Sequence, residues 1–176
     1  DEFVHWSRKP SRVFVDEPPT FRWFEGGLTN IAWSAVDRNI EEGRGDQVAI
    51  IGADERGGRR SVTYHELLEL VRRIAAALRG LGVGRGDRVT IYMPTTIEAI
   101  ATMLAAARIG AIHSVVFAGF GAGALGDRVR ACGSKVVIAA DLTYRKGKDV
   151  PLESIRSEDH RLNSSHLGIS YAVFCL

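Results

Sequence analysis

The sequence predicts an α/β protein with a doubly wound, mostly parallel sheet and flanking helices. The main observation is that strand and helix patterns alternate through residues 88–140, which is typical of right-handed βαβ units. A second observation is the nearly continuous apolar run at 111–117, of the kind buried on both faces of a parallel sheet. In such sheets ligands bind outside the carboxyl ends of the strands, so the segments that follow the strands are the candidate site.

Composition is ordinary for a globular domain. The 176 residues are 45% hydrophobic and 25% charged, and the net charge of +2 is too small to indicate a nucleic-acid or membrane surface. The two cysteines provide neither a disulfide framework nor metal-ligand spacing, and no secretory signal or membrane-length apolar run is visible. We therefore expect a cytoplasmic protein with no nucleic-acid partner and no membrane partner.

Residues 1–46 are expected to form an N-terminal arm and a helix packed on the domain. The first 30 residues hold six aromatic residues and three prolines without periodicity, which indicates an irregular arm docked on a surface. Trp23 and Phe24 are the expected anchors of this arm. Asn30 is a plausible N-cap for a helix that ends at Gly43.

Residues 47–155 are expected to form a partial α/β domain. Strands are expected at 47–51, 60–63, 88–93, 111–117 and 135–140. Thr63 and Thr95 are each followed three residues later by Glu, a capping-box pattern that predicts the start of a helix. A further helix is expected over roughly 122–131. The sequence at 156–176 does not continue this alternation of strand and helix patterns, and we interpret it as a non-native tail.

A short basic segment is the part of the chain whose residue types most clearly indicate ligand binding. Arg145, Lys146 and Lys148 surround Gly147, just beyond the strand expected at 135–140. Glycine lets a loop wrap closely around a ligand, and the planar arginine fork grips phosphate or stacks on adenine. Composition alone favours a solvated basic loop over a ligand-binding loop. The position at a strand end reduces that preference.

A turn of small residues follows the strand expected at 111–117. Phe117, Ala118 and Gly119 form a segment along which a ligand chain can pass close to the backbone. On pattern alone, a helix N-terminal turn that binds nothing is the better interpretation. His113, inside the apolar strand, is interpreted as a hydrogen-bonded core residue. We identify no catalytic residue and no metal ligand.

Residues 6–155 resemble the front part of short-chain acyl-CoA synthetases, the AMP-forming acetate–CoA and propionate–CoA ligases. The resemblance lies in RWFEGGLTN at 22–30, VVFAGF at 115–120 and YRKGK at 144–148, with Asp37 and Arg38 as a structural ion pair. It implies part of the large N-terminal domain of the adenylate-forming fold.

The resemblance also implies a role for the two strand-end segments. Arg145 and Lys148 would meet the nucleotide and 3′-phosphate of coenzyme A, with Lys146 and Gly147 between them. Phe117, Ala118 and Gly119 would line its pantetheine and adenine side. The family pattern there is VVFGGF, so Ala118 replaces a glycine and would be strained if that position needs a positive φ.

The implied activity is that of an acid–thiol ligase. A carboxylate, acetate or propionate, would react with ATP to give acyl-adenylate and pyrophosphate, and coenzyme A would then give acyl-CoA and AMP. ATP, coenzyme A and Mg²⁺ are implied for the full-length enzyme. Residues 1–176 contain neither the Ser/Thr/Gly-rich phosphate loop nor the lysine of a C-terminal domain, so we expect this part alone to be inactive. The alternatives are a non-catalytic α/β module that binds an anionic nucleotide, and an interaction domain whose glycine loops are only turns.

Overall fold

The structure is a computed structural model that describes residues 4–145 and 148–152. The expected tail at 156–176 lies outside the described residues, as do Lys146 and Gly147. The central body contains β5 (Arg88–Tyr92), α3 (Ile97–Arg108), β6 (Ile112–Val115), α4 (Ala122–Cys132) and β7 (Val136–Ala139). Within the described residues, no helix combines the length and the apolar character that crossing a membrane requires.

A small parallel sheet of order β6-β5-β7 forms the centre of this body, which confirms a mixed α/β architecture. In the register of the sheet, Val89 of β5 lies opposite His113 on one side and Val136 on the other. Successive residues of a strand face opposite sides of a sheet. All four residues of β7 are buried, so both faces of this strand are covered.

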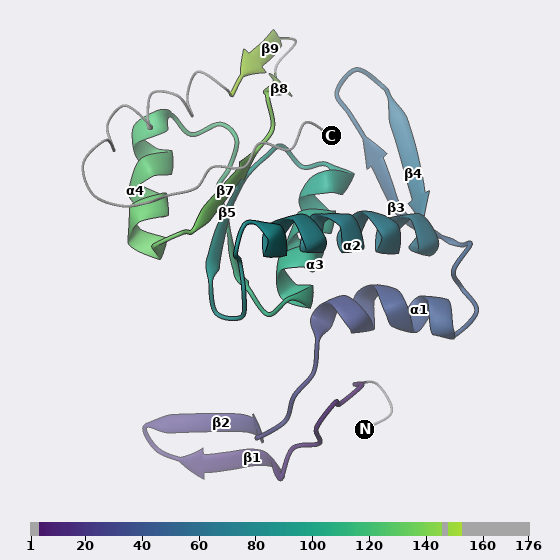
Figure 1. Cartoon of the computed structure of the whole chain (residues 1–176), viewed down its shortest axis with the longest axis vertical. Coiled ribbons are helices and arrows are strands. Elements are labelled where there is room, and N and C mark those ends of the chain that lie inside the picture. The colour runs from purple at the N-terminus through teal and green to yellow at the C-terminus, as the bar shows by residue number, and fades with distance from the viewer. Residues whose placement is uncertain (1–3, 146–147, 153–176) are drawn as a thin grey trace.

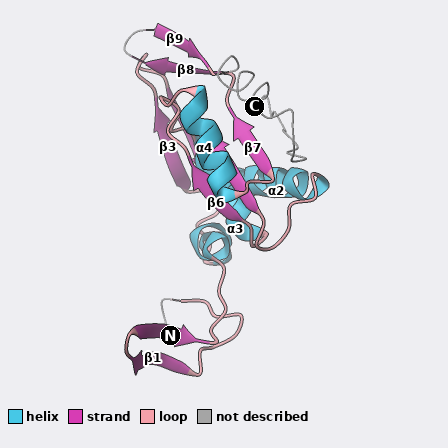
Figure 2. Ribbon diagram, turned by 90° about the vertical axis from the view of Figure 1, so that its left-hand side faces the viewer, coloured by secondary structure: helices cyan, strands magenta, loops and turns pink. Residues whose placement is uncertain are grey.

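The two faces of the sheet belong to two apolar clusters. Val136 and Ile138 pack in a large cluster with α3 and with α2 (Tyr64–Gly80), whereas Val137 and Ala139 pack in a smaller cluster with α4. Figure 1 shows α2 and α3 on one side of β5 and β7 and α4 on the other, and Figure 2 shows α4 in front of the sheet.

Strand β6 differs from its prediction. The apolar run at 111–117 was expected to be buried on both faces, but Ile112 and Val115 are 56% and 51% exposed. Among the described strands, β6 pairs only with β5 and forms an edge of the three-stranded sheet, so part of it stays uncovered. His113 on this strand is exposed, and the expectation of a core histidine is therefore wrong.

The helix starts agree with one capping box and correct the other. Thr63 Oγ1 accepts a hydrogen bond from the Glu66 backbone N–H, and the Glu66 carboxylate accepts one from the Thr63 N–H, as expected. The second box does not form at Thr95. Thr96 is the N-cap of α3, because its hydroxyl accepts from the Ala99 N–H at 3.2 Å.

The described residues form three antiparallel hairpins beside the central body. They are β1 (Arg12–Glu17) with β2 (Thr20–Glu25), β3 (Val48–Ala53) with β4 (Arg59–Thr63), and β8 (Leu142–Arg145) with β9 (Lys148–Pro151). The last of these shows that the basic segment expected as a loop belongs to a hairpin. In Figure 1 this hairpin continues upward from β7, and the turn between β3 and β4 rises beside it.

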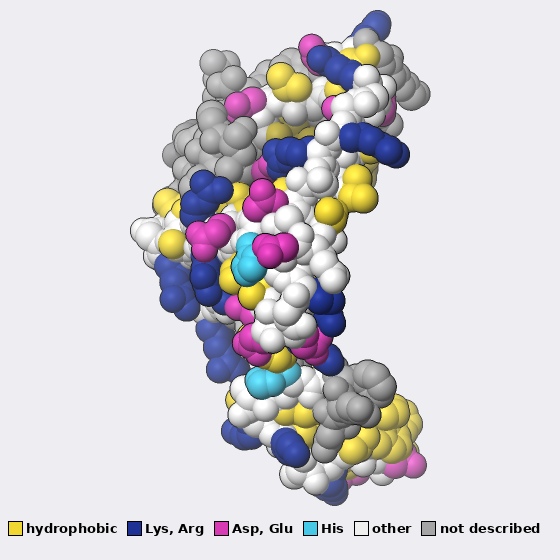
Figure 3. Space-filling view, turned by 90° about the vertical axis from the view of Figure 1, so that its right-hand side faces the viewer, with side chains coloured by type: hydrophobic (Ala, Val, Ile, Leu, Met, Phe, Trp, Pro, Cys, Tyr) yellow, Lys and Arg dark blue, Asp and Glu magenta, His cyan; other side chains and the backbone are white. Residues whose placement is uncertain are grey.

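The N-terminal arm is a hairpin with exposed aromatic residues, not an irregular docked segment. Phe14 contacts both Phe21 and Trp23 within the hairpin, with ring centroids 6.2 and 4.6 Å apart. Trp23 is 63% exposed and Phe24 is also exposed, so these two residues do not anchor the arm as expected. Cross-strand aromatic pairs replace burial against the domain. Figure 3 shows the resulting apolar patch on the lower lobe of the molecule.

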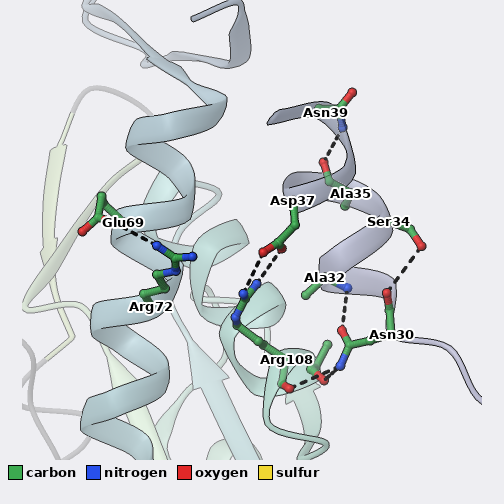
Figure 4. Close-up of polar contacts among 10 residues, drawn as sticks. Asn30, Ala32, Ser34, Ala35, Asp37, Asn39, Glu69, Arg72 and Arg108 are labelled. Atoms are coloured by element: carbon green, nitrogen blue, oxygen red, sulfur yellow. Dashed lines mark hydrogen bonds and ion pairs between the residues drawn. The ribbon is translucent and has the colours of Figure 1, made fainter. Parts of the chain in front are cut away.

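Polar contacts made by the segment after the hairpin attach it to α3. Asn30 Oδ1 accepts from the Ala32 N–H at 2.9 Å, which confirms Asn30 as a cap, and its amide nitrogen donates to the carbonyls of Ala107 and Arg108. Asp37, at the end of the π-helical η1 (Trp33–Asp37), accepts two hydrogen bonds from Arg108 (Figure 4).

The expected ion pair between Asp37 and Arg38 is therefore wrong. Adjacent helical residues do not face each other, and Arg38, the first residue of α1 (Arg38–Glu41), pairs with Glu42 one turn later. Asp37 instead pairs with a residue 71 positions away.

Candidate ligand site at the carboxyl edge of the sheet

The carboxyl ends of the three parallel strands meet at one edge of the sheet. Because β5 is central, the segments that follow β6 and β7 leave the sheet on either side of it. These are the turn at 117–120 and the hairpin β8–β9, the two segments that the sequence indicated. This edge is the position at which α/β sheets bind ligands.

The turn after β6 is fixed from below by a buried tyrosine. Tyr92, the last residue of β5, is fully buried, and its hydroxyl donates to the Phe120 carbonyl at 2.6 Å and lies 3.4 Å from the Ala118 carbonyl. Burial raises the pKa of Tyr92, so the hydroxyl stays protonated as a donor. Sequence reasoning missed this residue, although a hydroxyl at the end of a buried strand is a signal that could have found it.

The turn presents an aromatic surface to its surroundings. The Phe117 ring is 58% exposed and meets the Phe120 ring edge-on, with centroids 5.9 Å apart. The Arg128 guanidinium of α4 lies 4.5 Å from the centroid of the Phe120 ring. Gly119 between them is exposed. An exposed ring beside a small residue suits contact with a flat or chain-like ligand.

Ala118 fits this turn without the strain considered from its sequence. Its side chain is buried, and among the described non-glycine residues only Phe24 has a positive φ, of 53°. The replacement of a glycine by Ala118 therefore does not force an unfavourable backbone. What the alanine changes is the space beside the backbone, which its methyl group partly fills.

Two residues of the basic segment lie at the paired ends of β8 and β9. Arg145 and Lys148 lie directly opposite each other in the β8–β9 register, so the structure brings their backbones together. Lys148 is exposed. At the base of the hairpin, Leu152 is fully buried and its N–H donates to the Asp141 carbonyl at 2.8 Å. The base of the hairpin is thus held in the smaller apolar cluster.

A second hairpin contacts this basic hairpin from the side. The Arg56 guanidinium, in the turn between β3 and β4, lies 4.1 Å from the centroid of the Tyr144 ring and forms an ion pair with Asp149. Arg56 and Asp149 are 93 positions apart. No local sequence signal announces such a contact, which explains why sequence reasoning missed it.

A cleft of about 340 Å³ separates the β3–β4 hairpin from the start of α3. Within it Arg60 of β4 forms an ion pair with Glu98 of α3. Burial acts to raise the pKa of Glu98, but the hydrogen bond from Arg60 and further favourable contacts outweigh it, so the pKa is lowered and the carboxylate is charged. The main role of this pair is to fasten the hairpin to the helix. Within the described part of the chain, no three acidic, His or Cys side chains gather to hold a metal ion.

Comparisons with known proteins agree with the motif-based resemblance. Residues 36–173 match the model described as AMP-binding enzyme, and residues 1–35 match that of the acetyl-coenzyme A synthetase N-terminus. The chain is 50% identical over 159 residues to an acetyl-coenzyme A synthetase of Deinococcus radiodurans, covering 90% of this chain and 24% of the relative.

Two further relatives show the same partial coverage. A 3-hydroxypropionyl-coenzyme A synthetase of Metallosphaera sedula is 50% identical over 163 residues, covering 93% of this chain and 24% of the relative. An acetyl-coenzyme A synthetase of Herminiimonas arsenicoxydans is 45% identical over 157 residues, covering 88% of this chain and 24% of the relative. The chain thus spans about a quarter of the length of the curated relatives it matches.

Proposed function

The chain belongs to the AMP-binding enzyme family, and on that premise we propose that it is the N-terminal part of an AMP-forming, short-chain acyl-CoA synthetase. In this proposal it supplies part of a doubly wound large domain, whose sheet continues beyond the exposed edge of β6. The relatives are named for acetyl- and 3-hydroxypropionyl-coenzyme A, which supports a short-chain carboxylate such as acetate or propionate as the substrate.

The proposed reaction has two steps. A carboxylate oxygen attacks the α-phosphate of ATP, which gives acyl-adenylate and releases pyrophosphate. The thiol of coenzyme A then attacks the acyl carbon, and AMP leaves. Mg²⁺ would accompany the phosphates of ATP. We assign this chain to the binding of coenzyme A, and we assign no bond-making or bond-breaking role to its side chains.

The single observation that carries this assignment is the pairing of Arg145 with Lys148 beyond the carboxyl end of β7. Two cationic residues at the tip of a hairpin suit the 3′-phosphate and ribose end of coenzyme A, with Lys146 and Gly147 completing the segment. The exposed ring of Phe117, with Ala118 and Gly119 behind it, suits the less polar pantetheine chain.

We expect Arg145→Ala and Lys148→Ala, in the full-length protein, to weaken the use of coenzyme A roughly 10- to 100-fold, because charged hydrogen bonds contribute about 1.5–3 kcal/mol. Formation of the adenylate does not involve coenzyme A and should be unchanged. The measurements are acyl-CoA formation and ATP–pyrophosphate exchange on the same preparations. With 3′-dephospho-coenzyme A as substrate, the loss in the variants should be smaller.

Arg73→Ala is the matched control, since Arg73 is an exposed cation on α2, away from this edge. It should leave both assays unchanged. Equal losses of exchange and acyl-CoA formation in the Arg145 and Lys148 variants would refute the assignment, and so would normal use of coenzyme A in both.

A further inference from the structure

We propose that Arg56 is a positioning residue that holds the basic hairpin β8–β9 where Arg145 and Lys148 meet the phosphates of coenzyme A. The role of the hairpin in this statement rests on the proposed function. The role of Arg56 as its support rests on contacts between two hairpins that are distant in sequence.

Arg56 sits in a turn whose backbone is already fixed. Asp54 Oδ1 accepts hydrogen bonds from the N–H groups of Arg56 and Gly58, both at 2.8 Å. Gly57 adopts a φ of +84°, which glycine reaches without strain. Because the hydrogen bonds to Asp54 already order this turn, Arg56 contacts the neighbouring hairpin without the entropic cost of ordering a flexible loop.

The hairpin that carries Arg56 is fastened to α3 and so provides a stationary support. Arg60 pairs with Glu98 in the first turn of α3. Gly52 of β3 lies so close to α3 that a Cβ there would meet the Cγ1 atom of Ile97 at 3.3 Å. Because α3 packs on the central sheet, the position of Arg56 is tied to the main body of the molecule.

Arg56 contacts both strands of the basic hairpin at a single cross-strand pair. Tyr144 and Asp149 are a cross-strand pair in the β8–β9 register, and the next pair toward the tip is Arg145 with Lys148. One guanidinium thus stacks on the aromatic partner and forms an ion pair with the acidic partner. Successive residues of a strand face opposite sides, so Lys148 lies on the face turned away from Arg56 and stays available to a ligand.

The first test measures the position of the hairpin without any ligand. Trypsin cleaves after arginine, and the rate of cutting after Arg145 in the folded chain reports how often the hairpin opens. An exposed ion pair and a cation–π contact each alter such an equilibrium about 2- to 5-fold, so Arg56→Ala should raise the rate roughly 5- to 20-fold. Asp149→Asn should give part of that increase.

Two variants control this experiment. Arg59→Ala removes an exposed cation at the base of the same turn and should leave the cutting rate unchanged. Arg56→Lys keeps a cation beside Tyr144 and Asp149 and should hold the rate close to that of the native chain. Equal rates for Arg56→Ala and Arg59→Ala, or a rate for Arg56→Lys as high as that for Arg56→Ala, would overturn the proposal.

The second test uses the full-length protein. If both proposals hold, Arg56→Ala raises KM for coenzyme A by the factor by which it lowers the closed fraction of the hairpin, which is at most the rise in the cutting rate, with kcat and ATP–pyrophosphate exchange unchanged. A cutting rate that shows the hairpin to be mostly open, together with an unchanged KM, would support Arg56 as the support of the hairpin but overturn the coenzyme A assignment. A fall in pyrophosphate exchange alongside the rise in KM would overturn the positioning role, because general loss of structure then explains both.

Discussion

At the scale of single residues, the pair between Asp37 and Arg108 joins the N-terminal helix to α3. Its side chains are only 13% and 26% exposed, and two parallel hydrogen bonds of 2.7 and 2.8 Å link them. The hydrogen bonds from Arg108 are the main cause that lowers the pKa of Asp37, and burial opposes them without cancelling them. Such bidentate pairs are geometrically specific as well as strong.

Stability should therefore depend on pH through Asp37. Its folded pKa lies below the ordinary value of 3.8, so its contribution is complete above that pH and is lost as the pH falls through the folded pKa. We expect Asp37→Asn to lower the free energy of unfolding by roughly 1.5–3 kcal/mol at pH 7. The difference from the native chain should shrink below pH 3.8. Urea titrations at several pH values measure this.

Asp127→Asn provides the control for this prediction. It removes an ion pair with Arg130 whose side chains are 75% and 45% exposed, and such surface pairs contribute little. If Asp127→Asn costs as much as Asp37→Asn, or if the difference at Asp37 persists in acid, the account of Asp37 is wrong.

At the scale of elements, two adjacent threonines at the start of α3 have different roles. Thr96 caps the helix through its hydroxyl, whereas Thr95 is exposed. Loss of an N-cap costs about 0.5–2 kcal/mol, so Thr96→Ala should lower the free energy of unfolding by that amount. Thr95→Ala should change it far less. Chemical denaturation of the two variants side by side decides between Thr96 and the capping box that the sequence pattern suggests at Thr95.

These threonines show how far local patterns predict the fold. At Thr63 the capping pattern agrees with the long-range structure, and the helix start is correct to the residue. At Thr95 the same pattern fails, since the N-cap is Thr96 one residue later and Glu98 pairs with Arg60 from another element. The apolar sequence of β6 predicted a strand correctly. The pattern alone does not reveal that part of this strand lies uncovered. Helix and strand identities are thus local properties, whereas partners and burial are not.

The same distinction applies to the candidate site. The order of strands and helices was enough to predict that Phe117 and Arg145 follow strands of one parallel sheet. The residues that hold these segments act across separations of 28 positions for Tyr92 and 93 for Arg56. Tyr92 carries a local signal, a hydroxyl at the end of a buried strand, whereas the contact of Arg56 with the distant hairpin has none. The prediction of an irregular, docked arm was wrong for a related reason. Its aromatic residues pair with one another across a hairpin, and their spacing in the sequence has no period that indicates this pairing.

At the scale of the whole molecule, the two apolar clusters share one sheet while the N-terminal hairpin stands apart. Alternate residues of β7 contribute to each cluster, so loss of packing on one face removes the support of the other. Strands β1 and β2 pair with each other in a separate two-stranded sheet. Such hairpins are marginally stable by themselves. The central body should therefore unfold as one unit, and the hairpin should open independently of it.

Amide hydrogen exchange tests this division. Leu78→Ala removes a fully buried side chain from the larger cluster, which typically costs about 2–5 kcal/mol. Exchange at the β5 and β7 amides should accelerate by the same factor on both strands, although Val137 and Ala139 face the other cluster. Exchange in β1 and β2 should be fast in the native chain and unchanged in the variant.

Phe21→Thr is the complementary change, because it alters an exposed side chain of the hairpin. It should speed exchange in β1 and β2 and leave β5 and β7 as they were. Acceleration of β1 and β2 by Leu78→Ala, to the same extent as the sheet, would mean that the hairpin belongs to the cooperative unit. In that case the contacts of Asn30 and Asp37 with α3 transmit stability to the hairpin as well as holding the helix that follows it.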